Sequence, residues 1–190
     1  PEKTLFLLVA KEDGKLLDTI TSRCQILHVN RVSDLNLKSY LKNKFELNKE
    51  KAESVAAFSD GNIIKAHEIL NLNEDEESLK DHFIELMRSS YKKNVLEMIN
   101  WAEEIAQKGQ ERQKIFLMYT THMLRQCLLK NYIGTEHIKL SESEMNFLEK
   151  FAPFVNGNNI RGFMKSIDEA YYQLERNANP KILFTLLCFQ

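Results

Sequence analysis

Residues 4–25 read TLFLLVAKEDGKLLDTITSRCQ, and this stretch decides which class of fold we expect at the start of the chain. Residues 4–10 are a continuous apolar run, typical of a strand that is buried on both faces of a sheet. A polar turn follows, and then the apolar residues of one short helix that ends near Ser22. A second short apolar stretch at residues 25–29 predicts another strand. Residues 1–30 therefore predict the tail of an α/β domain, whose sheet needs further strands to form a core.

After Arg31 the apolar spacing changes from that of strands to that of helices. Three short helices are predicted in residues 31–73, the second with Asn48 as its N-cap and the third after a break at Asp60-Gly61. Their apolar stripes consist of Leu37, Tyr40, Leu41 and Phe45, then Ala52, Val55 and Ala56, then Ile63, Ala66, Ile69 and Leu70.

Residues 74–190 have helical periodicity throughout and predict a helical bundle. Gly109 suits the end of one helix and Pro180 the first position of the last helix. The helices that we expect cover about 76–91, 93–108, 111–131, 142–154, 158–177 and 180–189. The fold class predicted for the whole chain is mainly α, with two helical units that meet near residues 72–77.

The charge balance argues against a protein that binds nucleic acid by itself. The 190 residues include 26 Lys and Arg against 27 Asp and Glu, a net charge of −1. Proteins that depend on phosphate contacts usually carry a basic surplus. Acidic residues are interleaved with both small basic groups, so we interpret these groups as solvated faces: Lys38, Lys42 and Lys44, and Arg88, Lys92 and Lys93.

The aromatic residues of the second half fall at helical core spacing and predict packing rather than base stacking. They are Phe147, Phe151, Phe154, Phe163, Tyr171 and Tyr172.

Cysteine and histidine patterns predict no metal site. Cys24, Cys127 and Cys188 have no C-x-x-C spacing, and the five histidines form no H-E-x-x-H pattern. No apolar run approaches the ~20 residues that span a bilayer, and no signal peptide opens the sequence. We expect a cytoplasmic protein with reduced cysteines, no metal and no cofactor.

Residues 4–25 resemble the clamp-loader ATPases of the AAA+ superfamily. In that family the apolar strand ends at the sensor 1 position, and the following helix leads to a Ser-Arg-Cys motif, here Ser22-Arg23-Cys24. The resemblance implies that Arg23 points across a subunit boundary at the ATP of a neighbouring subunit. A planar, permanently charged guanidinium stabilises the charge that develops on a transferring phosphoryl group.

Residues 58–70, FSDGNIIKAHEIL, resemble the lid-domain helix of the same family. ATP-hydrolysing members have Gly-Ser-x-Arg-x-Ala there, and the arginine is sensor 2. Ile64 stands at that position, and Ala10 stands where sensor 1 usually has threonine. Neither side chain can contact a phosphate, so the resemblance implies an ATPase site that no longer senses its own nucleotide.

A trans arginine combined with degenerate sensors is the pattern of the delta-prime subunits of bacterial DNA polymerase III clamp loaders. Residues 177–188, NANPKILFTLLC, resemble the final helix of their collar. The resemblance implies an AAA+ remnant in residues 1–30, a lid domain in residues 31–73 and an oligomerising collar in residues 74–190. Because the sequence begins at Pro1 rather than at Met, shortly before an apolar run, we expect a C-terminal fragment.

The implied function is that of a non-hydrolysing accessory subunit, which helps to load the sliding clamp onto primed DNA during replication. The implied partners are the gamma/tau and delta subunits through the collar, and the clamp and DNA through the assembled complex.

Three alternatives remain open. A gamma/tau ATPase would need an arginine at sensor 2, where this chain has Ile64. A branch-migration helicase would end in a winged-helix domain, and the C-terminal pattern is helical instead. The third is a stand-alone helical scaffold in which Ser22-Arg23-Cys24 is accidental. A degenerate G-x-x-x-x-G-K-[ST] loop in the upstream coding sequence would favour delta-prime over gamma/tau.

Overall fold

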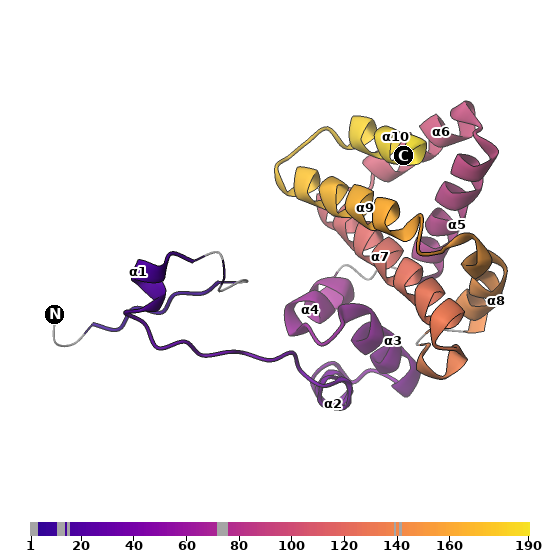
Figure 1. Cartoon of the computed structure of the whole chain (residues 1–190). Coiled ribbons are helices and arrows are strands. Elements are labelled where there is room, and N and C mark those ends of the chain that lie inside the picture. Colours follow the sequence, from indigo (N-terminus) through magenta and orange to yellow (C-terminus); the bar gives the residue numbers. More distant parts are fainter. Residues whose placement is uncertain (1–3, 11–13, 15, 72–75, 139, 141) are drawn as a thin grey trace. The chain divides into compact units, whose positions relative to one another are not determined.

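The chain is described here from a computed structural model that covers residues 4–10, 14, 16–71, 76–138, 140 and 142–190. It forms two compact units, Pro1–Arg31 and Val32–Gln190. Every regular element in the described residues is a helix, which confirms the predicted mainly α fold (Figure 1).

The first unit contains one short helix, α1 (Asp18–Thr21), between irregular segments. The strands predicted at residues 4–10 and 25–29 are wrong, because both segments are irregular and their apolar side chains are exposed, Val9 by 99%. A strand is stabilised by hydrogen bonds to a neighbouring strand and by burial against a second layer. The described residues of this unit supply neither, so apolar composition alone does not produce a strand.

Three helices open the second unit: α2 (Asp34–Phe45), α3 (Lys49–Ser59) and α4 (Ile63–Asn71). The predicted N-cap of α3 is confirmed, since the Asn48 side chain accepts the Lys51 backbone N–H at 2.8 Å. Asp60 and Gly61, with φ of 50° and 74°, make the predicted break. The predicted stripes meet in a small core, which consists of Leu37, Leu41, Ala52, Val55, Ala56, Ala66 and Ile69.

The remaining helices agree with the predicted ranges to within a few residues, except that the short helix η2 was not predicted. They are α5 (Glu76–Lys92), α6 (Val95–Ala106), α7 (Gln110–Tyr132), η2 (Thr135–His137), α8 (Glu142–Phe151), η3 (Ala152–Phe154), α9 (Ile160–Glu175) and α10 (Pro180–Phe189). Pro180 begins α10 as expected, behind the cap Asn179, whose side chain accepts the Ile182 N–H at 3.2 Å. Gly109 differs from its prediction: α6 already ends at Ala106, and Gly109 with φ of 84° precedes α7.

Helix α7 runs through the middle of these helices, with α9 lying along it and α10 against α6 (Figure 1). Their shared core is rich in large side chains, of which the most deeply buried are Phe83, Trp101, Ile105, Ile115, Phe116, Leu117, Met123, Leu124, Leu148 and Phe184. Such a core of interlocked aromatic rings contributes much of the stability of a helical domain.

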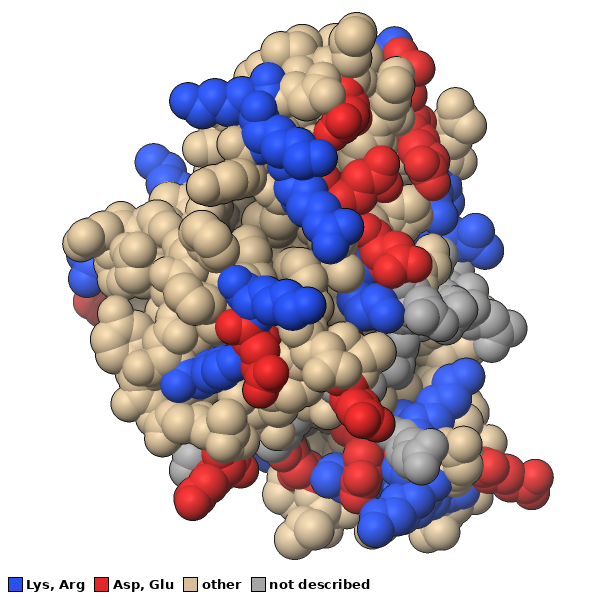
Figure 2. Space-filling view, turned by 90° about the vertical axis from the view of Figure 1, so that its right-hand side faces the viewer, with Lys and Arg blue, Asp and Glu red and all other residues tan. Residues whose placement is uncertain are grey.

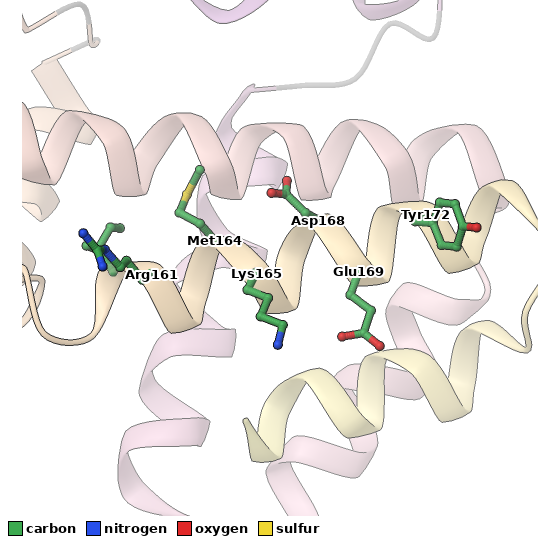
Figure 3. Close-up of a pocket in the computed structure, with 7 residues that line it drawn as sticks. Arg161, Met164, Lys165, Asp168, Glu169 and Tyr172 are labelled. Atoms are coloured by element: carbon green, nitrogen blue, oxygen red, sulfur yellow. The ribbon is translucent and has the colours of Figure 1, made fainter. Parts of the chain in front are cut away.

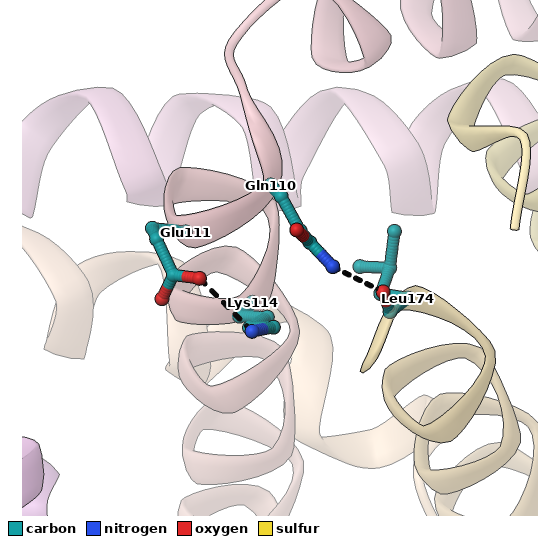
Figure 4. Close-up of polar contacts among 4 residues, drawn as sticks. All are labelled: Gln110, Glu111, Lys114 and Leu174. Carbon is teal, nitrogen blue, oxygen red and sulfur yellow. Dashed lines mark hydrogen bonds and ion pairs between the residues drawn. The ribbon is translucent and has the colours of Figure 1, made fainter. Parts of the chain in front are cut away.

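The start of α7 also satisfies carbonyls at the ends of two neighbouring helices. Gln113 Nε2 donates to the carbonyls of Ile105 and Ala106 at 3.1 and 2.9 Å, and Gln110 Nε2 donates to the carbonyl of Leu174 (Figure 4). The last carbonyls of a helix lack intrahelical partners, so these bonds hold the ends of α6 and α9 against α7. Beside them Lys114 Nζ lies 2.9 Å from Glu111, and this hydrogen bond raises the pKa of Lys114.

The small core of α2–α4 and the large core share Phe58. Its ring packs edge-on against Tyr119 of α7, with centroids 5.8 Å apart, and next to it Asp60 forms an ion pair with Arg125 at 3.2 Å. These contacts dock α3 on α7. The predicted domain boundary at residues 73 and 74 lies outside the described residues, and the three-domain division stays a prediction.

Candidate functional site

Ser22-Arg23-Cys24, the predicted trans-acting motif, forms the turn that ends α1. The Ser22 N–H donates to the carbonyl of Asp18 at 3.0 Å, and the Arg23 N–H donates to that of Ile20 at 3.1 Å. All three motif residues are exposed. The turn therefore holds the backbone of Arg23 by local hydrogen bonds, and the residue is exposed.

The two predicted sensor positions, residues 10 and 64, have apolar side chains that are exposed. Ala10 lies in the irregular segment of the first unit and is exposed. Ile64 is the second residue of α4, 70% exposed, and its N–H donates to the Asn62 side chain at 3.0 Å. The side chain at each position therefore offers neither a hydrogen-bond donor nor a cation to a phosphate. Arg23 and Ala10 belong to the first unit and Ile64 to the second.

One face of α10 is apolar and exposed. Ile182, Leu186 and Phe189 recur at spacings of four and three residues and are 62%, 54% and 56% exposed. The opposite face, with Leu183 and Phe184, is buried against the core. An apolar helix face of this kind is typical of a surface that a partner covers.

Helices α6 and α10 run antiparallel. Lys181 pairs with Glu103, whereas the Cys188 thiol lies 3.9 Å from the carbonyl of Met98 near the start of α6. Leu96, which is also exposed, therefore lies at the same end of the helix pair as Phe189.

Helix α9 borders an open groove of about 620 Å³, lined by Ile160, Arg161, Met164, Lys165, Asp168, Glu169 and Tyr172. Figure 3 shows Lys165 and Glu169 on one side of α9 and Met164 and Asp168 on the other. The two bases, Arg161 and Lys165, precede the two acids, Asp168 and Glu169, and the whole lining comes from a single helix. The groove is therefore a feature of the surface and not an enclosed pocket for a small molecule.

On the face shown in Figure 2, basic side chains lie beside acidic ones. Two of the singled-out lysines make local contacts: Lys38 pairs with Glu53 at 3.6 Å, and Lys44 donates to the Tyr40 hydroxyl at 2.9 Å. Both contacts agree with the interpretation of the first basic group as a solvated helix face.

The other singled-out residues serve mainly in packing. Phe147, Phe151, Phe163 and Tyr171 contact the large core, as predicted, while Phe154 and Tyr172 are half exposed. Burial raises the pKa of Cys127 and of Cys188 to about 12, so both thiols stay protonated and unreactive at neutral pH. Cys24 is the exposed cysteine.

Sequence analysis did not single out Ile182, Leu186 and Phe189. Their helical spacing was visible, but α10 is apolar on both faces, so periodicity does not tell which face is buried. Packing of α10 on α6 decides which face is buried.

The chain matches no protein-family model, and no curated protein and no solved structure is similar to it. None of the described helices is long and apolar enough to cross a membrane.

Proposed function

We propose that this chain is the C-terminal part of a delta-prime subunit of a bacterial DNA polymerase III clamp loader. It works in the cytoplasm without hydrolysing ATP, and helps the complex to load the sliding clamp onto primed DNA. Its helical collar joins gamma/tau and delta subunits in a ring, and Arg23 completes the ATPase site of a neighbour.

The observation that carries this proposal is the exposed Arg23 in a turn after a short helix, inside Ser22-Arg23-Cys24. A guanidinium supplied in trans makes hydrolysis depend on assembly, because the neighbour's site lacks its cation until the subunits meet. The apolar residues at positions 10 and 64 agree with a subunit that supplies such a group and does not use ATP itself.

Incorporation into the ring tests the proposal. The full-length parent is mixed with gamma/tau and delta subunits of the same organism, and the complexes are weighed by native mass spectrometry. We expect one copy of the parent in each ring. Rings that form and load clamps equally well without the parent, and never include it, would contradict the assignment.

The exposed face of α10 should be part of the collar interface. Leu186→Glu places a charge on this face, and we expect the affinity of the parent for the ring to fall about tenfold or more, since desolvating an unpaired carboxylate at an interface is costly. The affinity is measured by surface plasmon resonance, with circular dichroism as a check of folding.

Leu35→Glu is the matched control, because Leu35 is an exposed leucine on α2, away from α10. Equal affinities for the two variants and the unchanged parent would mean that the exposed face of α10 lies outside the interface.

The chain itself should not bind ATP. Ala10 and Ile64 offer no group to a phosphate, and the sequence contains no G-x-x-x-x-G-K-[ST] loop. Calorimetric titration with millimolar ATP and Mg²⁺ should give only the heat of dilution. A stoichiometric micromolar site would point to a gamma/tau subunit instead.

A helical scaffold outside replication is the second candidate, favoured by the same exposed face of α10, which any protein partner could cover. The two functions differ at Arg23: a scaffold that binds through α10 has no use for this guanidinium, whereas a clamp-loader subunit loses activity without it.

A further inference from the structure

Three potential metal ligands meet where α5 packs against α6, outside every feature used above. They are His82 and Glu85 of α5 and Glu104 of α6, and one ligand atom of each lies within 4.8 Å of the others. His82 Nε2 is 3.7 Å from a carboxylate oxygen of Glu104. His82 is buried, whereas the two glutamates are exposed.

The backbone around these side chains is held in place by the core. Trp101 Nε1 donates to the carbonyl of His82 at 3.1 Å, which connects α5 directly to α6. Glu104 lies three residues after Trp101, about one helical turn, and Glu85 lies three residues after His82. The His82 ring also meets the ring of Phe116 edge-on, with centroids 6.4 Å apart. A buried imidazole held by the core, with exposed carboxylates beside it, is a suitable support for a metal ion.

The negative charges of Glu85, Glu97 and Glu104 lie near one another at this place. Burial raises the pKa of Glu85, and the charges of Glu104 and Glu97 raise it further. A bound cation would remove this repulsion between like charges.

We propose that His82, Glu85 and Glu104 bind a divalent transition-metal ion of the zinc class, which fastens α5 to α6. The donors are one imidazole nitrogen and two carboxylates, a set that suits Zn²⁺, whereas Mg²⁺ and Ca²⁺ prefer oxygen ligands alone. In a tetrahedral zinc site neighbouring ligand atoms are roughly 3.3 Å apart, given bonds of about 2.0–2.1 Å. The pair at 3.7 Å is already close to this, and the exposed glutamates can rotate to close the rest. Water would complete the coordination, and the site is independent of the proposed function.

Zinc titration with matched variants tests the site. The exposed Cys24 could bind zinc by itself, so all proteins carry Cys24→Ser. Isothermal calorimetry should show one Zn²⁺ per chain, and the melting temperature should rise with Zn²⁺ and fall back with chelator. Glu85→Gln and Glu104→Gln should each weaken binding at least about tenfold, since they keep the shape of the side chain and remove its charge. They spare the His82 ring, which packs in the core.

Glu97→Gln is the control, because Glu97 contributes to the same potential without belonging to the ligand set. It should keep binding within about threefold, as expected for the loss of a nearby charge alone. Loss of zinc binding in both ligand variants, with the control retained, supports the site. Absence of saturable binding, equal affinity in all four proteins, or equally effective competition by Mg²⁺ would overturn it.

Discussion

Replacing Arg23 by alanine in the full-length parent should leave the clamp-loader ring assembled and cut ATP hydrolysis at one interface by a factor on the order of 10³ or more. Arg23 is exposed, and in the proposed function its guanidinium contacts only the neighbouring subunit, so we expect neither folding nor the helical interface to depend on it. The remaining interfaces keep their own arginines. Total ATPase activity should therefore fall in part, while clamp loading, which needs all interfaces, falls further.

Arg23→Lys should restore little of the activity. Lysine keeps the charge but concentrates it at one point on a flexible stem, whereas the planar guanidinium presents several donors at fixed angles to a phosphate. The measurements are steady-state ATP hydrolysis and clamp loading on primed DNA, with ring stoichiometry checked by native mass spectrometry. Arg31→Ala is the control, because it removes another exposed arginine from the same unit. If both Arg23 variants match the control, Arg23 is an ordinary surface residue and the proposed function fails with it.

The helices could be predicted from the sequence because each carries its own apolar stripe and its own end signals. Asn48 and Pro180 lie where capping rules put them, and residues such as Leu41 and Ala66 face the core that their spacing implies. These signals are local, so no knowledge of the neighbouring helices is needed to interpret them.

The prediction of strands was wrong because the signals that make a strand are not local. Residues 4–10 have the composition of a buried strand, but a strand exists only through its pairing, and pairing partners cannot be inferred from the segment itself. The exposed side of α10 and the cluster of His82, Glu85 and Glu104 also depend on contacts between helices. The spacing of His82 and Glu85 is visible in the sequence, but Glu104 joins them only because α6 packs on α5.

Trp101 should be among the most costly residues to remove from the fold. It is 1% exposed, its ring packs against Phe116 and Phe184 with centroids 5.5 and 5.8 Å away, and its N–H donates to the carbonyl of His82. Trp101→Ala leaves a cavity between α5, α6, α7 and α10 and also removes the hydrogen bond from the indole to that carbonyl. Large-to-small changes of this kind lower the free energy of unfolding by about 3–5 kcal/mol.

Trp101→Phe separates the two contributions. Phenylalanine keeps most of the apolar volume and loses the N–H, so the free energy of unfolding should fall by less than for alanine, with about 0.5–1.5 kcal/mol coming from the lost hydrogen bond to the carbonyl of His82. Leu96→Ala is the control on the same helix, because Leu96 is exposed and should change stability by less than about 0.5 kcal/mol. Urea unfolding followed by circular dichroism gives all three values. A Trp101→Ala loss no larger than that of Leu96→Ala would mean that α6 does not pack on α5 and α10 through this ring, and the positions of both α10 and the candidate zinc ligands would then have to be redrawn.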